Sequence, residues 1–136
     1  MTEWWADVVA KFVAAFITKD RWRLYLNGLG LTMEIAFFAG IIGIILGIII
    51  ALCRLSRSRN GGKTFLSVIA GIYIDVIRGT PSVLQLLIMW FIIMKNTTNS
   101  VLVASLAFGI NSGAYVAEIF RAGILAVDPG QTEAGR

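Results

Sequence analysis

A charge-free apolar run from Ile35 to Cys53 is the feature that most limits what this chain can fold into. Its length matches the ~20 residues that an α-helix needs to cross the hydrocarbon core of a bilayer. The chain of 136 residues is 57% hydrophobic and only 15% charged, whereas ordinary soluble domains are roughly 25% charged. A water-soluble domain of this size could not cover so much apolar surface. The sequence therefore predicts an all-α membrane protein.

Several other functions are excluded or disfavoured by residue content. Cys53 is the only cysteine, so an intrachain disulfide is impossible, and the absence of histidine excludes a histidine-based catalytic triad. No cluster of metal-ligand type is present in the sequence. The net charge of +4 comes with no nucleic-acid-binding motif. We therefore expect no metal, no histidine-based catalytic triad and no nucleic-acid partner.

The second apolar segment, residues 64–94, contains the helix-breaking sequence RGTP at residues 78–81. As one straight helix the segment would measure roughly 47 Å, far more than the ~30 Å hydrocarbon core. Pro81 lacks an N–H group and clashes with the carbonyl four residues earlier, so we expect a break there. Gly79 suits the end of the first half. Thr80 is expected to cap the second half, with Pro81 at its first helical position.

Two of the apolar spans carry small residues at every fourth position. This spacing places them on one helix face, where another helix can approach closely, because lipid offers no hydrophobic drive between helices. These rows therefore predict helix packing rather than chemistry. They are Gly43, Gly47 and Ala51 in the first span, with Ala36 and Gly40 on a neighbouring row, and Ser105, Gly109, Gly113 and Ala117 in the third.

The N-terminal region, residues 1–23, has the pattern of an amphipathic helix. Its polar side carries Glu3, Asp7 and Lys11, four residues apart. Tryptophan is favoured at the membrane interface, so an interfacial helix is one interpretation. A helix packed on other subunits fits the pattern equally well. The apolar face is Trp4, Trp5, Val8, Val9, Phe12, Val13 and Phe16.

The remaining chain, residues 24–136, is predicted to form the membrane domain, with spans at about 31–53, 64–94 and 100–127. The loop after the first span is basic, with Arg54, Arg57, Arg59 and Lys63, and has no acidic residue. Dense positive charge favours the cytoplasmic side. The N-terminus is then outside and the C-terminus is cytoplasmic.

The final residues, VDPGQTEAGR, begin a new helix on the cytoplasmic side. Asp128 can act as N-cap, Pro129 suits the first helical position, and Gln131 follows the cap by three residues, as in a capping box. By local chemistry alone, a simple capped interfacial helix fits this segment about as well as a functional one.

Three motifs in order carry a family resemblance: RGTP-x3-Q-x-L, then NSGAYVAEIFRAGI, then DPGQTEAGR. Together with LNGLGLTMEIA before the first span, they resemble the permease subunits of ATP-binding-cassette importers for polar amino acids. The resemblance covers about residues 24–136 and implies a partial ABC-importer permease (MetI-like) fold.

The resemblance also implies a coupling helix that docks in a groove on an ATPase subunit. Gly135 stands where many relatives have alanine. The chain stops before the family's downstream glycine and its last membrane spans, so the resemblance implies an incomplete permease. The coupling residues would be Gly130, Gln131, Thr132, Glu133, Ala134, Gly135 and Arg136.

The implied function is a transport subunit, not an enzyme, in a bacterial plasma membrane. The resemblance adds a cytoplasmic ATPase that binds ATP and Mg, a second permease (the same or a related chain), an external solute-binding protein and an amino-acid substrate. This chain has no phosphate-cradling glycine loop of its own. An ATP-independent secondary transporter or channel, and a membrane anchor without a transport role, are the alternatives.

Intramembrane polar residues are the candidates for the translocation pathway. A stripe of Thr64, Ser67, Gly71, Asp75 and Arg78 must face water, a polar cavity or another protein, because charge facing lipid is costly. Glu118 and Arg121 can pair at i, i+3, which favours a structural ion pair over ligand contact. An interhelix role is likewise favoured for Asp75 and Arg78. The candidates are Asp75, Arg78, Thr80, Gln85, Asn111, Ser112, Glu118 and Arg121, next to the helix break at Gly79 and Pro81.

Overall fold

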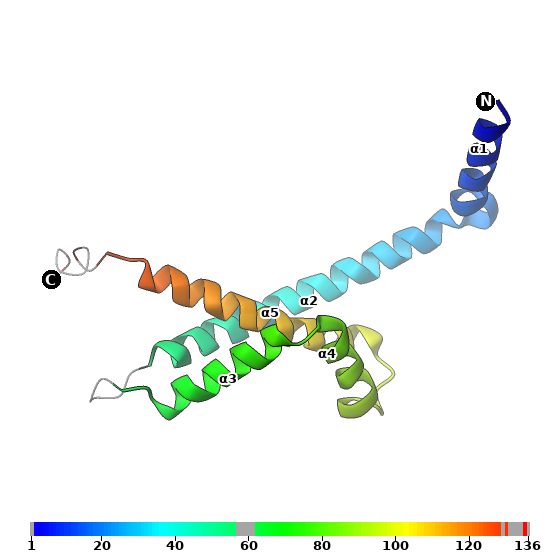
Figure 1. Ribbon diagram of the computed structural model, residues 1–136. Coiled ribbons are helices and arrows are strands. Elements are labelled where there is room, and N and C mark those ends of the chain that lie inside the picture. The colour runs from blue at the N-terminus through cyan, green and yellow to red at the C-terminus, as the bar shows by residue number, and fades with distance from the viewer. Residues whose placement is uncertain (1, 57–61, 129, 131–134, 136) are drawn as a thin grey trace. The chain divides into compact units, whose positions relative to one another are not determined.

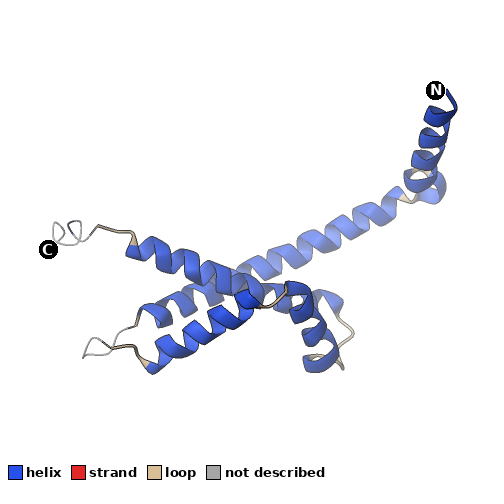
Figure 2. Cartoon of the chain, in the orientation of Figure 1, coloured by secondary structure: helices blue, strands red, loops and turns tan. Residues whose placement is uncertain are grey.

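The computed structural model describes residues 2–56, 62–128, 130 and 135, and these contain helices, turns and loops but no β-sheet (Figure 2). Within these residues, two helices are long and apolar enough to cross a membrane, and there are three spans if the bent pair counts as one. This confirms the predicted fold class. The elements, labelled in Figure 1 where space allows, are α1 (Thr2–Phe16), η1 (Thr18–Asp20), α2 (Trp22–Leu55), α3 (Phe65–Gly79), α4 (Ser82–Ile88), the π-helical turn η2 (Met89–Ile93) and α5 (Ser100–Leu125).

The chain divides within α2 into two compact units, Met1–Glu34 and Ile35–Arg136. In the first unit, α1 is the amphipathic helix that the sequence predicts, and Lys11 forms an ion pair with Asp7 one turn earlier, at 2.6 Å. The chain then turns through η1, where Lys19 and Asp20 adopt positive φ angles of 57° and 55°. The first unit thus supplies a short helix and the start of α2.

In the second unit, α2 and α5 cross where both carry small residues. A Cβ atom added to Gly43 would lie 3.4 Å from the backbone nitrogen of Gly113, and one added to Gly109 would lie 3.4 Å from the carbonyl oxygen of Ala39. The two backbones therefore approach closely, which confirms the packing predicted for these rows. The neighbouring row is different: a Cβ atom added to Gly40 would meet no atom within 4 Å among the described residues.

The second span breaks at the predicted place. α3 ends at Gly79, α4 begins at Ser82, and the two axes differ by 105° (Figure 1). Thr80 is extended (φ −111°, ψ 142°), as expected for a residue before proline. The predicted capping was wrong in detail: Pro81 itself is the N-cap of α4, and the Thr80 hydroxyl donates backwards to the Val76 carbonyl at 3.0 Å.

The start of α3 is fixed against the end of α2. Thr64 is the N-cap of α3, where its hydroxyl oxygen accepts from the Ser67 N–H at 3.2 Å and its O–H donates to the Ser56 carbonyl at 3.2 Å. The Ser67 hydroxyl in turn donates to the Arg54 carbonyl at 2.9 Å. Two polar side chains at the start of α3 thus satisfy backbone groups that the ends of both helices leave unpaired.

Candidate functional site

A side-chain network centred on Gln85 occupies the inside of the bend. Because Pro81 has no N–H, the Ile77 carbonyl loses its normal helical donor. The Gln85 side-chain amide replaces that donor, with its Nε2 atom 2.8 Å from the Ile77 oxygen and 2.6 Å from the Thr80 hydroxyl oxygen. The helix break and the side chain that completes its hydrogen bonding are therefore four residues apart in sequence.

Two further hydrogen bonds join the broken segment to α5. Asn111 donates from Nδ2 to Oε1 of Gln85 at 3.1 Å, and the Tyr73 hydroxyl donates to the Ile110 carbonyl at 2.6 Å. The amide groups of Gln85 and Asn111 are only partly buried. Both halves of the broken span are therefore attached to the same turn of α5.

A mostly apolar cavity of about 260 Å³ adjoins this network. Thr80 and Gln85 are its polar members, and its apolar walls come from α3, α4, η2 and α5. Uncharged polar groups in an apolar wall can orient a small polar molecule, which is the usual composition of a ligand pocket.

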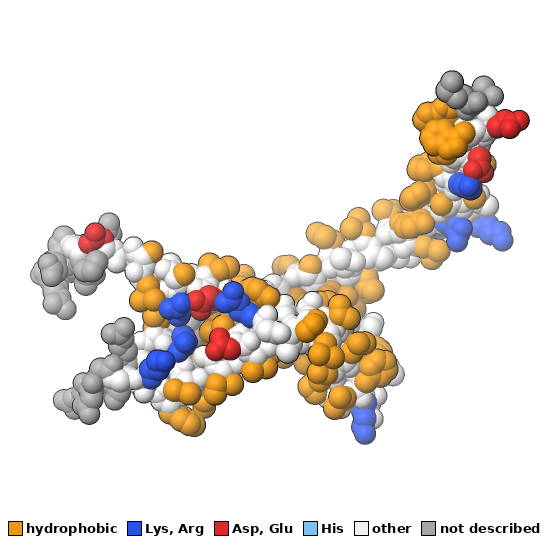
Figure 3. Space-filling view, viewed as in Figure 1, with side chains coloured by type: hydrophobic (Ala, Val, Ile, Leu, Met, Phe, Trp, Pro, Cys, Tyr) orange, Lys and Arg blue, Asp and Glu red, His pale blue; other side chains and the backbone are white. Residues whose placement is uncertain are grey.

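Charged side chains gather on one face of α3 and α5 (Figure 3). Arg78 lies over the ring of Tyr115, with its Cζ atom 5.2 Å from the ring centroid. Arg121 donates from Nε to Oε2 of Glu118 at 3.0 Å, the ion pair that their spacing predicts. Asp75 is exposed on the neighbouring turn of α3. The face therefore carries both signs of charge within two helices of the membrane domain.

The pathway residues predicted from the sequence fall into separate groups in the structure. Thr80, Gln85 and Asn111 meet at the break, whereas Asp75, Arg78, Glu118 and Arg121 belong to the charged face.

The other candidates lie elsewhere. Ser112 packs over Gly43 at the crossing of α2 and α5, since a Cβ atom on Gly43 would lie 2.7 Å from its hydroxyl oxygen. Asp128, the predicted N-cap of the C-terminal segment, accepts a hydrogen bond from the Gly130 N–H at 2.7 Å through its carboxylate. Pro129, residues 131–134 and Arg136 lie outside the described residues, so most of the predicted coupling helix does too.

Sequence reasoning missed the partners of several of these groups. Tyr73 and Tyr115 were not identified as partners of the Ile110 carbonyl and of Arg78, and Arg54 was used only to orient the loop. Helical spacing places residues on a face of their own helix, but it does not say which residue of another helix lies opposite. Among the described residues, no three side chains of metal-ligand type lie together.

The model of the family "Binding-protein-dependent transport system inner membrane component" matches residues 43–136. The chain belongs to this family of membrane-embedded transport components. The match includes the bend, the charged face and the C-terminal motif, so these features lie within the region that defines the family.

Individual relatives extend the similarity toward the N-terminus. The arginine transport system permease protein ArtQ of Bacillus subtilis is 45% identical over 112 residues, covering 80% of this chain and 49% of the relative. The L-cystine transport system permease protein TcyB of the same organism is 37% identical, covering 88% of this chain and 50% of the relative. A putative glutamine transport system permease protein GlnP of Rickettsia conorii is 37% identical, covering 79% and 49%. The chain thus spans about half the length of these relatives.

A solved structure has the same fold. The crystal structure of an amino acid ABC transporter with histidines matches with a TM-score of 0.71 and 42% identity, and the match covers 84% of this chain and 52% of the other. The fold is therefore that of part of an ABC-importer permease.

Proposed function

We propose that this chain acts as a permease subunit of an ATP-driven importer that carries polar amino acids across the bacterial plasma membrane. The observation that supports this most strongly is the combination of the family match over residues 43–136 with 45% identity to an arginine permease. Relatives named for glutamine and cystine transport support a polar amino acid as the class of substrate.

The charged face and the break provide the polar groups of the pathway. Asp75 and Arg78 are exposed on α3, and Glu118 and Arg121 are partly exposed on α5. Charges inside a membrane domain are costly unless they line a polar route or meet a partner. An amino acid at neutral pH carries an ammonium and a carboxylate, so a face bearing both signs is complementary to it.

Energy is supplied by a cytoplasmic ATPase that binds ATP and Mg on its own chain. Residues 130–136 form the segment that couples this chain to the ATPase. The Asp128 carboxylate, which accepts from the Gly130 N–H at 2.7 Å, supports a capped helix start. An external solute-binding protein delivers the substrate, and a second permease, the same or a related chain, completes the pathway.

Orientation follows from charge. Arg54 and Lys63 flank the connection between α2 and α3, and this end of the domain is the cytoplasmic side. The residues that join η2 to α5 then lie outside, and α5 returns the chain to the cytoplasm. In this orientation the coupling segment lies on the same side as the ATPase.

Uptake in membrane vesicles tests the function directly. Vesicles that hold the chain with its ATPase and binding protein should accumulate labelled arginine, glutamine or cystine only when ATP is supplied inside the cytoplasmic compartment. An ionophore that collapses ion gradients should leave that uptake intact. Uptake that persists without ATP but disappears with the ion gradient would instead indicate a secondary transporter.

A further inference from the structure

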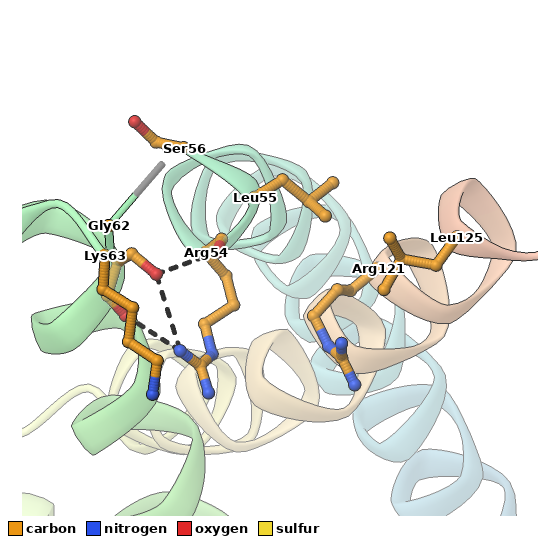
Figure 4. A pocket seen from close by; sticks show the side chains of 8 residues that line it. Arg54, Leu55, Ser56, Gly62, Lys63, Arg121 and Leu125 are labelled. Carbon is orange, nitrogen blue, oxygen red and sulfur yellow. Dashed lines mark hydrogen bonds between the residues drawn. The ribbon is translucent and has the colours of Figure 1, made fainter. Parts of the chain in front are cut away.

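A cavity of about 560 Å³ lies where α2 ends, α3 begins and the last turns of α5 pass by (Figure 4). Three cationic side chains from three separate segments line it: Arg54 at the end of α2, Lys63 before α3, and Arg121 in α5. Figure 4 shows the nitrogen-bearing ends of these three side chains pointing the same way. The cavity is separate from the network at the break.

Arg54 is held in place by its neighbours. Its Nη1 atom donates to the Ser67 carbonyl at 3.3 Å. Gly71 leaves room for the guanidinium, because a Cβ atom there would lie 3.2 Å from the Arg54 Cζ atom. A guanidinium carries five N–H donors, so most remain available to a ligand. The side chain is thus positioned before any ligand binds, which lowers the entropic cost of binding.

The cavity carries excess positive charge. Arg121 is paired with Glu118, but among the described residues no carboxylate forms an ion pair with Arg54 or Lys63. An anion in the cavity would therefore offset charge that the described residues leave unbalanced.

The apolar surroundings indicate what kind of anion fits. Leu55 and Leu125 line the cavity beside the cations. Leu52 and Phe65, each two residues in sequence from a basic residue of the cavity, are 59% and 79% exposed. A ligand with an anionic head and apolar chains would satisfy both surfaces. Basic pockets between membrane helices at the cytoplasmic side are suited to the phosphate groups of anionic lipids.

We propose that this cavity binds the phosphate headgroup of an anionic phospholipid, with Arg54 and Lys63 as the main contacts and Arg121 completing the site. A phosphate accepts several hydrogen bonds, and guanidinium groups match its geometry. The leucines and the exposed apolar residues then contact the acyl chains. The site shares Arg121 with the charged face, but its main contacts, Arg54 and Lys63, lie outside that face, so the proposal does not depend on which substrate the protein carries.

Lipid binding to the purified chain in neutral detergent tests the site. Native mass spectrometry with added phosphatidylglycerol or phosphatidylcholine should detect preferential retention of phosphatidylglycerol. Lys63→Gln should weaken that retention about fivefold, since one basic residue near a membrane surface contributes about 1 kcal/mol. Lys95→Gln is the matched control, because Lys95 is exposed before the opposite end of α5. Lys95→Gln should leave the retention of phosphatidylglycerol unchanged.

Arg54→Gln should weaken retention more than Lys63→Gln does, with circular dichroism to check that the helices persist. If Arg54→Gln fails to fold, Lys63→Gln alone decides, because Lys63 is exposed and donates no hydrogen bond to the described residues. Equal retention of the two lipids, or equal effects of Lys63→Gln and Lys95→Gln, would overturn the proposal. Displacement of phosphatidylglycerol by millimolar inorganic phosphate would also overturn it, because the site would then be one for free phosphate.

Discussion

The Asn111 side chain donates a hydrogen bond of 3.1 Å to Gln85, the residue whose amide also replaces the missing N–H of Pro81. This one contact connects a helix break to a neighbouring helix. Any change in the angle between α3 and α4 must therefore alter either this hydrogen bond or the position of α5. A broken span joined to a neighbouring helix in this way is suited to switching between distinct arrangements of α3, α4 and α5.

Gln85→Leu should destabilise the membrane domain by about 1–3 kcal/mol, because it leaves the Asn111 amide without its partner and the Ile77 carbonyl with only the longer, 3.3 Å contact from the Thr80 hydroxyl. Asn111→Leu should cost less, about 1 kcal/mol, since it removes a single hydrogen bond. Thermal unfolding in detergent measures both, with the exposed Val83→Ala as control. The double variant should lose less stability than the sum of the losses in the two single variants. Strictly additive losses of stability would contradict a hydrogen bond between Gln85 and Asn111.

Gly47→Ala should destabilise the crossing of α2 and α5 by about 1–3 kcal/mol through overpacking. The added Cβ atom would press on Val116 and lie 3.1 Å from the backbone nitrogen of Ala117. Gly40→Ala is the matched control, because its Cβ atom would meet nothing within 4 Å and alanine favours the helix by up to about 1 kcal/mol. Equal melting temperatures for the two variants would show that the crossing is not close-packed.

Arg78→Gln should raise the KM for amino-acid uptake several-fold while changing stability little. A cation–π contact at an exposed site contributes only about 0.5–1 kcal/mol to stability, and Tyr115 is 43% exposed. Arg78→Lys should retain part of the affinity because it retains the charge. If KM is unchanged in Arg78→Gln, the charged face is not part of the pathway.

A cysteine at Ser58, in a Cys53→Ala background, should be protected from impermeant thiol reagents added outside intact cells. A cysteine at Asn96, between η2 and α5, should react readily. Both results follow from the basic connection between α2 and α3 lying in the cytoplasm. The reverse labelling pattern would invert the orientation of every span.

The helices, the break and the crossing could be predicted because they depend on short-range chemistry. Proline removes a donor wherever it lies, and glycines four apart share a face of any helix. The exact capping at the break was mispredicted because the Thr80 hydroxyl can either accept from the N–H groups of α4 ahead of it or donate to the carbonyls of α3 behind it. The backward carbonyls, which lost their donors, are the ones it contacts.

The pairings between helices could not be predicted in this way. Arg78 with Tyr115, Tyr73 with the Ile110 carbonyl, and Gln85 with Asn111 all join residues far apart in sequence. Each depends on the relative rotation of two helices, which packing across the whole interface decides. One sequence without its relatives contains no signal for that rotation.

Retention of the ATPase on the affinity-tagged chain tests the central proposal, a permease coupled through residues 130–136, most directly. Co-purification should occur with the unaltered chain and with Glu3→Lys, the matched charge reversal on α1. Glu133→Lys should weaken it, and deletion of residues 128–136 should abolish it. Co-purification that is unaffected by the deletion would contradict the coupling assignment.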